Sequence, residues 1–316
     1  MEKNILPIKK AVLIFFVFAS GYFLSGLLRA ITATLSPLFT SEFNLNAGDL
    51  GLLAGGYFLG FASMQIPLGY LLDKYGPKKI LSVLLLIAIL GTVAFAFSQN
   101  FTGLLISRIL IGVGVSACLM SSLIGYRMWF ADEYLQRSNA WMLMVLTIGF
   151  VVSTWPVQFL LPIIGWRWIF GIIAILILVV IILTLLFIPE WKTEKNNQEK
   201  NSRSLSDVWR NKFFQSTIPL GLFNYGGIVA IQTLWAGPWM VRVAGYTPLE
   251  SATGLFWINT TMLIAFFVFG YILPKITKLG FDSIKLMKFG MPISYVSLLI
   301  IIILGESAGA IYFTIY

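Results

Sequence analysis

GYLLDKYGPKK, from Gly69 to Lys79, separates two long apolar runs by a charged connection of only a few residues. Gly69 permits close contact between helices, and Asp73 and Gly76 predict a tight turn, because aspartate bonds local backbone and glycine tolerates positive φ. Three lysines place positive charge at one side of the two runs: Lys74, Lys78 and Lys79. A basic connection between apolar runs is typical of a loop on the cytoplasmic side of a membrane.

The composition predicts an all-α, polytopic membrane protein. Of the 316 residues, 58% are hydrophobic and only 11% are charged, and the mean hydropathy is +0.88. Soluble domains carry about 25% charged residues, so this chain is far too apolar for that class. The apolar run that follows Lys9 and Lys10 is also much longer than the hydrophobic region of a signal peptide, so we expect it to remain as a spanning helix.

Several function classes are excluded by what the sequence contains. The net charge of +9 does not predict nucleic-acid binding, because the basic residues lie between apolar runs and not on a polar face. The chain has no histidine and one cysteine, Cys118, which lies in an apolar run. We therefore expect no disulfide, no metal site and no cofactor. No nucleophile–base pair or phosphate loop is present, so we do not expect an enzyme.

A spanning helix needs about 20 apolar residues. Nine runs meet this rule: 11–38, 47–72, 80–98, 101–126, 139–161, 165–188, 213–241, 248–273 and 284–304. With the N-terminus in the cytoplasm, 18 of the 22 Lys and Arg residues fall on the inner side, and only Arg167 and Arg242 fall outside. The positive-inside rule thus predicts a multi-pass protein of the cell inner membrane with a cytoplasmic N-terminus.

The stretch Gly69–Lys79 resembles the loop between the second and third helices of the major facilitator superfamily, which reads Gly-x-Leu-x-Asp-Arg/Lys-x-Gly-Arg-Arg/Lys. One position departs, because Pro77 stands where the family often has arginine. Lys78 is then the expected partner for a long-range ion pair. The resemblance implies a gating role for this loop, whose candidate residues are Gly69, Asp73, Lys74, Gly76, Lys78 and Lys79.

Arg108–Gly114 is similar to another element of this superfamily, Arg-x-x-x-Gly-x-Gly in the fourth helix. The fifth helix lacks the Gly-Pro-Gly-Gly type of element found in drug/proton antiporters. The entry into the first two helices, with Arg29, Pro37 and the run 65–69, is closer to the organic-anion and nitrate-type branches.

The resemblance implies two six-helix halves related by an axis along the membrane normal. We expect residues 1–188 to form the first half, 189–212 a central cytoplasmic loop, and 213–316 an incomplete second half with three helices and the start of a fourth. An internal repeat agrees: Gly270–Leu273 repeats Gly69–Leu72 at an offset of 201, which also aligns Glu250 with Asp49. The interpretation is of a C-terminally truncated chain that is inactive or unstable by itself.

Two arginines lie inside predicted spans, where charge is costly unless it faces a partner or a watery cavity. Arg29 lies roughly 14 Å and Arg108 roughly 10 Å from the outer ends of their helices, at about 1.5 Å per residue. The pair is suited to hold an anion by bidentate bonds. Two structural alternatives stay open: Arg108 bonding the backbone carbonyls of the first helix, and Arg29 extending outward to the interface.

Neutral polar side chains in the apolar runs complete the candidate substrate site. They are Tyr57, Gln65, Asn224, Tyr225, Gln232, Trp235 and Asn259. Each of them is also explained as a contact between helices. The sequence Asn224-Tyr225-Gly226-Gly227 is the most suggestive, because adjacent glycines loosen a spanning helix.

The function expected is secondary transport of a small, anionic or zwitterionic solute by alternating access. The expected partners are this solute and the lipid bilayer, with no nucleic acid, and the expected oligomeric state is a monomer. A coupling ion is not identified, because every Asp and Glu falls in a loop or at a helix end. The alternatives are a non-transporting membrane sensor on the same fold and an inert truncated product.

Overall fold

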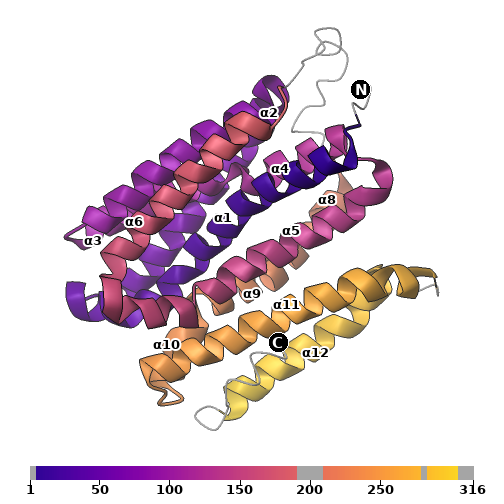
Figure 1. The fold of residues 1–316 in the computed structure, drawn as a ribbon. Helices are drawn as coiled ribbons and strands as arrows, with labels where there is room; N and C mark the ends of the chain where they lie inside the picture. The colour runs from indigo at the N-terminus through magenta and orange to yellow at the C-terminus, as the bar shows by residue number, and fades with distance from the viewer. Residues whose placement is uncertain (1–4, 191–208, 279–282, 305–316) are drawn as a thin grey trace.

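The computed structural model describes residues 5–190, 209–278 and 283–304, and every regular element in these ranges is a helix (Figure 1). The first part of the chain holds α1 (Ile8–Phe43), α2 (Ala47–Phe97), α3 (Phe101–Val115), α4 (Ala117–Trp129), α5 (Asp132–Val152) and α6 (Trp155–Phe187). The second part holds α8 (Lys212–Leu220), η1 (Gly221–Tyr225), α9 (Gly226–Ala230), η2 (Ile231–Trp235), α10 (Ala236–Arg242), α11 (Pro248–Lys278) and α12 (Ser283–Leu304). Within the described residues, six helices are long and apolar enough to cross a membrane, with α3 and α4 counted as one.

The long element α2 contains the turn predicted for Gly69–Lys79. Gly76 has φ 77° and ψ 165°, a conformation outside the helical region that a residue with a Cβ rarely adopts. Pro77 follows at the first position of the next helical segment, where its missing N–H costs nothing. The 51 residues of α2 therefore form two segments, in agreement with the predicted runs 47–72 and 80–98.

The predicted run 139–161 is wrong in its boundaries. Helix α5 begins at Asp132 and ends at Val152, and the backbone leaves the helical region at Thr154, with φ −95° and ψ −114°. Pro156 explains the break, because it cannot donate the hydrogen bond that would continue the helix. A second turn follows at Gly165, with φ 74°, so α6 is also divided. The predicted run 213–241 is likewise not one regular helix but a series of α and π segments.

Glycines allow α2 and α3 to approach closely. A Cβ added to Gly60 would overlap the carbonyl oxygen of Ile109, and one added to Gly112 would overlap the carbonyl oxygen of Tyr57. Small residues at such crossings let two backbones touch, which is the main source of packing energy between helices in a bilayer. A close backbone contact at a glycine also joins α1 to α5, where Gly26 faces the carbonyl of Leu146.

The turn between α1 and α2 recurs between α10 and α11. Asn44 has φ 54°, and Gly245, at the offset of 201, has φ 69°. Asn46 and Asp49 form a capping box, with Asp49 N 2.9 Å from Asn46 Oδ1. Thr247 N donates to Glu250 Oε2 at 2.8 Å, and Glu250 N donates to Thr247 Oγ1 at 3.2 Å.

The helix starts at Asp49 and Glu250 are therefore built alike, which extends the internal repeat from sequence to geometry. The hydrogen bonds from Thr247 lower the pKa of Glu250, so the carboxylate stays charged at the positive end of the helix dipole. In the repeat Gly270–Leu273, only the side chain of Ile272 lies within the described residues.

The second part of the chain packs on the first through α5 and α1. Helix α11 contacts α5 and α6, whereas η2 and α10 contact α1. A small apolar cluster joins the parts; its members are Ala33, Ala236, Met240, Leu255, Ile258 and Ile301. The division at residues 188 and 212 stays a prediction, and residues 191–208 lie outside the described part.

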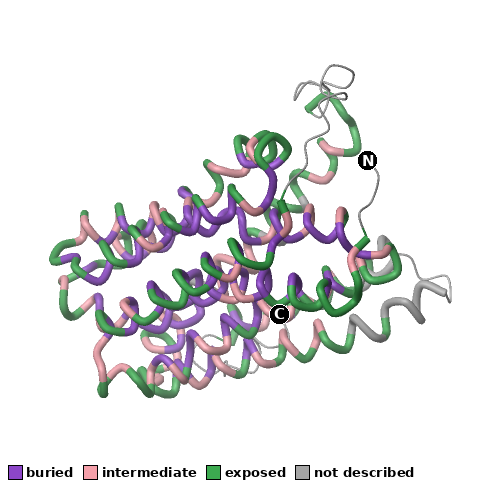
Figure 2. The backbone as a smooth tube through the Cα atoms, turned by 45° about the horizontal axis from the view of Figure 1, so that its top comes forward, coloured by how far each residue is buried: buried purple, intermediate pink, exposed green. Residues whose placement is uncertain are grey.

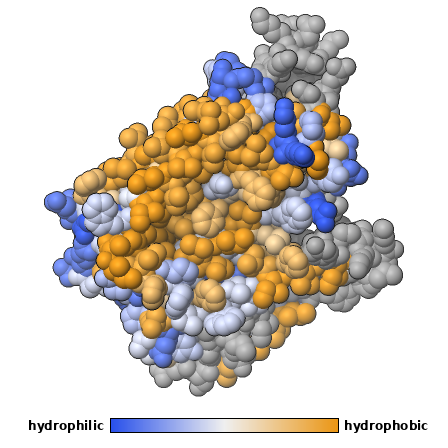
Figure 3. All heavy atoms as spheres, in the orientation of Figure 1, coloured by the Kyte–Doolittle hydropathy of each residue, from blue (hydrophilic) through white to orange (hydrophobic). Residues whose placement is uncertain are grey.

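Large apolar residues are found both among the buried and among the exposed residues of the bundle. Figure 2 shows exposed stretches along the helices, and hydrophobic residues cover much of the face drawn in Figure 3. On α6, for example, Ile175 is 63% exposed and Leu186 is 68% exposed. A soluble protein seldom exposes so continuous an apolar surface, because water disfavours it. This surface is suited to the hydrocarbon of a bilayer, so the protein spans a membrane several times.

We predict that Gly112→Ala lowers the thermal stability of the purified protein by at least about 3 °C, since overpacking costs about 1–3 kcal/mol. Gly55→Ala is the matched control, because a Cβ added at Gly55 meets nothing within 4 Å. Alanine also favours a helix over glycine, so the control should melt at the same temperature or higher. Equal melting of both variants and the parent would contradict the close contact at Gly112.

Candidate functional site

The two intramembrane arginines meet at one aromatic ring. Arg29, on α1, is 6% exposed, and Arg108, on α3, is 1% exposed. The Cζ of Arg108 lies 4.9 Å from the centroid of the Tyr57 ring on α2, and the Cζ of Arg29 lies 5.9 Å from it. Three of the predicted site residues therefore lie together, and the close α2–α3 contact at Gly112 fixes the backbone of Tyr57 beside α3.

Arg108 also ties α3 to α1. Its Nη1 donates a hydrogen bond of 2.7 Å to the carbonyl oxygen of Leu28, which is the structural contact that the sequence left open. The Nε of the same side chain is buried without a hydrogen-bond partner among the described residues. Because a guanidinium has five N–H donors, this one bond leaves donor capacity for a further partner.

Aromatic rings surround the Arg29 guanidinium. Its Cζ lies 5.8 Å from the ring centroid of Phe58 and 5.4 Å from that of Phe61. The negative face of a ring attracts a cation, more strongly where water is excluded. The hydroxyl of Tyr57 lies 3.4 Å from Ser25 Oγ, which orients the ring. Among the described residues no Asp or Glu is buried.

A pair of amides lies on the second part of the chain. Gln232 Nε2, on η2, donates to Asn259 Oδ1 on α11, and Asn259 Nδ2 donates to the Leu255 carbonyl at 2.9 Å. Helix η2 contacts both α1 and α2, and the residues that follow it, Ala236 and Gly237, pack near Ala33, one turn after Arg29 on α1.

The other polar residues predicted for the substrate site contribute less to it. Trp235 is 51% exposed, and Gln65 donates to the carbonyl of Phe61 on its own helix at 3.1 Å. Asn224 and Tyr225 lie in the π-helix η1, but their side chains lie outside the described residues. The adjacent glycines do coincide with irregular helix, since α9 is bounded by η1 and η2. Such π segments occur frequently at functional sites.

The candidate gating stretch contains one long-range ion pair. Lys78 Nζ lies 3.2 Å from Glu190 Oε1, so the prediction that Lys78 forms such a pair is confirmed. Lys74 Nζ lies 3.3 Å from Tyr70 Oη, and hydrogen bonds with Tyr70 and Tyr75 raise the pKa of Lys74. Gly69, Asp73 and Lys79 are exposed, and no described basic residue forms an ion pair with Asp73.

A cluster that the sequence did not reveal lies at the opposite end of α1. Glu42 Oε1 lies 2.7 Å from Arg167 Nη2, and Trp166 Nε1 donates to Glu42 Oε2 at 2.8 Å. Trp166 is only 4% exposed, because it packs on Phe39 and Phe95. The sequence features that could have indicated this cluster are an acidic residue at one helix end, Glu42, and the pair Trp-Arg after Gly165.

Comparison with known proteins decides the family. A sequence profile of the Major Facilitator Superfamily matches residues 18–316. The chain belongs to this superfamily. Its members are membrane transporters and not enzymes, which agrees with the expectation from the sequence.

The similar curated proteins are transporters of different solutes. The chain is 31% identical over 122 residues to a probable sulfoacetate transporter, SauU, of Cupriavidus necator, covering 39% of this chain and 28% of that protein. It is 24% identical to the glucose transporter GlcP of Staphylococcus epidermidis, covering 73% and 52%. It is 28% identical to the niacin transporter NiaP of Acinetobacter baylyi, covering 56% and 41%. Where a curated relative matches most of this chain, the match spans about half of that relative's length.

Solved structures confirm the fold. The superfamily transporter FucP in its outward conformation superposes with a TM-score of 0.70 at 19% identity, covering 95% of this chain and 80% of that chain. A D-xylose–proton symporter superposes with a TM-score of 0.65 at 15% identity, covering 96% and 79%. The all-helical architecture expected from the sequence is therefore confirmed.

A double-mutant cycle tests the cluster at Glu42. Because Glu42 and Arg167 are partly exposed, we expect a coupling free energy of about 0.3–1 kcal/mol between Glu42→Gln and Arg167→Gln in thermal or denaturant unfolding. The coupling should fall in concentrated salt, because salt screens partly exposed charges. Additive effects of the two substitutions at low salt would contradict the ion pair.

Proposed function

We propose that this protein is part of, or constitutes, a secondary transporter for a small solute that carries a carboxylate or similar anionic group. The observation that carries the proposal is the buried guanidinium of Arg108 at Tyr57, whose Nε has no hydrogen-bond partner among the described residues, with the guanidinium of Arg29 at the same ring. An anionic solute can accept the hydrogen bond that this Nε offers. Guanidinium groups are suited to this role because they bind carboxylates in a planar, bidentate geometry.

The remaining polar groups fit a zwitterionic or polar remainder of the solute. Tyr57, Gln232 and Asn259 offer hydroxyl and amide groups on three helices from both parts of the chain. The names of two relatives, for sulfoacetate and niacin, denote carboxylates, whereas the glucose transporter is named for a neutral sugar. The names therefore differ, and the arginines on this chain favour the anion.

Alternating access is supported by the contacts between the two parts of the chain, where α11 packs on α5 and α6, and η2 and α10 pack on α1. The ion pairs Lys78–Glu190 and Glu42–Arg167 lie within the first part and hold its helices together. Contacts made in one conformation and broken in another bias a two-state equilibrium. We propose that the Gly69–Lys79 stretch, with Asp73, contributes to this bias on a cytoplasmic side, and that the protein acts as a monomer in an inner membrane.

The architecture that corresponds to alternating access has two six-helix halves, and we propose that residues 1–188 form the first. The repeated turn geometry at Asn44 and Gly245 supports the same arrangement in both halves. No coupling ion is assigned, because the described residues include no buried carboxylate that could change its charge.

Arg29→Lys should weaken binding of sulfoacetate or nicotinate by about tenfold, since bidentate geometry is lost although the charge remains. Calorimetric titration of the purified protein measures this affinity, with glucose as the neutral ligand. Arg127→Gln is the control, because Arg127 is an exposed arginine in the last turn of α4, whereas Arg29 is buried.

Three results would contradict the anion site: glucose binding as tightly as both anions, no binding of either anion, or no effect of Arg29→Lys. Uptake of the bound anion into liposomes then separates a transporter from a sensor, since a sensor binds solute without moving it.

Asp73→Asn should slow uptake several-fold while leaving solute affinity and membrane insertion unchanged, because Asp73 lies in the turn and not at the arginines. Initial uptake rates and equilibrium binding together separate these effects. Glu133→Gln, which removes an exposed carboxylate from the first turn of α5, serves as the control. An unchanged uptake rate in Asp73→Asn would exclude the gating role.

A further inference from the structure

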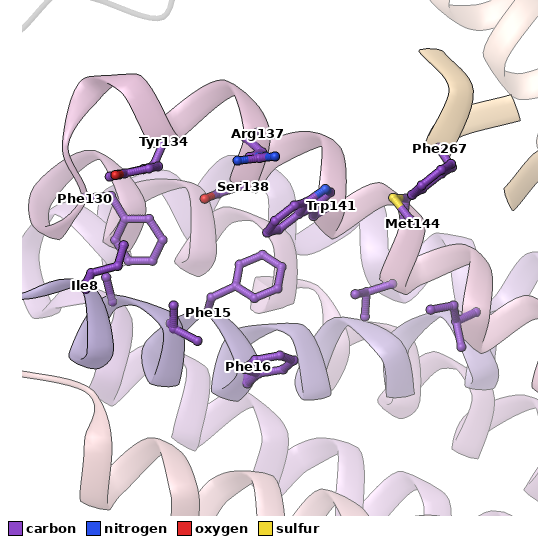
Figure 4. Close-up of a pocket in the computed structure, with 14 residues that line it drawn as sticks. Ile8, Phe15, Phe16, Phe130, Tyr134, Arg137, Ser138, Trp141, Met144 and Phe267 are labelled. Atoms are coloured by element: carbon purple, nitrogen blue, oxygen red, sulfur yellow. The ribbon is translucent and has the colours of Figure 1, made fainter. Parts of the chain in front are cut away.

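An elongated pocket of about 480 Å³ lies along α1 and α5, away from Arg29 and Arg108 (Figure 4). Its walls are almost entirely apolar and come from both helices, with Phe267 of α11 at one end. Phe15, Phe16 and Trp141 contribute aromatic surface, and Arg137 is the only charged residue among the described residues of the lining (Figure 4). The superfamily assignment and the proposed anion site make no use of this pocket.

The pocket is open to the lipid-facing surface. A neighbouring groove of about 340 Å³ shares Phe16, Val145 and Ile148 with it, and continues to α6. There it includes Leu176 and Val179, which are 42% and 44% exposed and belong to the apolar outer surface of α6. Hydrophobic side chains cover most of this face of the molecule (Figure 3). Hydrocarbon from the bilayer therefore has direct access to the pocket.

One end of the pocket lies where three helices end, at the depth of a membrane interface. Leu6 N donates to the Trp129 carbonyl at 3.0 Å, which joins the start of α1 to the end of α4. Tyr134 and Arg137 follow in the first turns of α5. From Arg137 to Ile148 the helix rises by roughly 16 Å at about 1.5 Å per residue. This length matches one leaflet, which is half of a hydrocarbon core of about 30 Å.

The charge at this end favours an anion. The Cζ of Arg137 lies 4.9 Å from the centroid of the Trp141 ring, so the side chain extends along the pocket wall and presents its charged group to the pocket. Exposed basic residues nearby are Lys9, Lys10 and Arg127, and the acidic residues are Asp132 and Glu133. The Glu133 carboxylate raises the pKa of the Tyr134 phenol. With Arg137, the basic residues named at this end number four against two acidic ones, so the local charge is positive.

We propose that this pocket binds one anionic phospholipid from the adjacent leaflet. Arg137 holds the phosphate through charge-assisted hydrogen bonds, and one acyl chain lies against Phe15, Phe16 and Ile148. The apolar lining supplies affinity for the chain, and the single arginine supplies the preference for a negative headgroup. Because α5 also contacts α11, a bound lipid joins the first part of the chain to the second through Phe267.

Native mass spectrometry of the full chain tests this proposal. The protein is equilibrated with phosphatidylglycerol or phosphatidylcholine that carry identical palmitoyl and oleoyl chains. We expect one phosphatidylglycerol to be retained about tenfold more tightly than phosphatidylcholine, as for a charge-assisted bond. Arg137→Gln should abolish the preference and Arg137→Lys should restore part of it. Arg242→Gln removes an equal charge from the last turn of α10, outside the pocket, and should leave the preference unchanged.

A second variant tests the acyl chain separately from the headgroup. Val12 lines the pocket and is 46% exposed, so Val12→Trp fills the space from its open side without disturbing the core. It should lower retention of phosphatidylglycerol although Arg137 is intact. Equal retention of both lipids by the parent, equal effects of Arg137→Gln and Arg242→Gln, or full retention by Val12→Trp would each overturn the proposal.

Discussion

The bond from Arg108 to the carbonyl of Leu28 is the contact on which the arrangement of the site depends. It places a permanently charged group between α1 and α3, where the low dielectric makes an uncompensated charge costly. The surrounding structure reduces this cost through the Tyr57 ring and the backbone oxygen, and it brings Arg29 to the same ring. The close approach of α1 and α3 allows the Leu28 carbonyl to accept this hydrogen bond from the charged group.

Small residues make this contact possible. The backbones of α2 and α3 touch at Gly60 and Gly112, so Tyr57 lies against the turn of α3 that follows Arg108. A larger side chain at either glycine would separate the helices and move the ring from the guanidinium. The same two glycines therefore determine both the packing of α2 on α3 and the position of the Tyr57 ring beside the guanidinium.

Local features of the fold could be predicted from the sequence. Gly76 and Pro77 specify the turn in α2 by their backbone preferences, and Asp49 and Glu250 mark helix starts. The break at Thr154 was missed, because hydropathy continues through it and only Pro156 indicates it.

Within the site, the type of residue was predictable but its partner was not. Intramembrane arginines are conspicuous in an apolar run, whereas the bonds from Arg108 to Leu28 and from Gln232 to Asn259 depend on how distant helices pack. The burial of Trp166 is a similar case, since the same residue type is common at lipid interfaces. The apolar pocket beside Arg137 also arises from packing, because its lining comes from separate helices.

The most direct test of the account is whether an anion contacts both guanidiniums. Nuclear magnetic resonance of protein labelled with ¹⁵N-arginine reports on each side chain, and Arg29→Gln and Arg108→Gln assign the two signals. Titration with sulfoacetate or nicotinate is predicted to shift the Nε resonances of Arg29 and Arg108 together, with one saturation curve, whereas glucose leaves them in place. Unchanged resonances at saturating anion, or equal shifts with glucose, would contradict the proposed anion site.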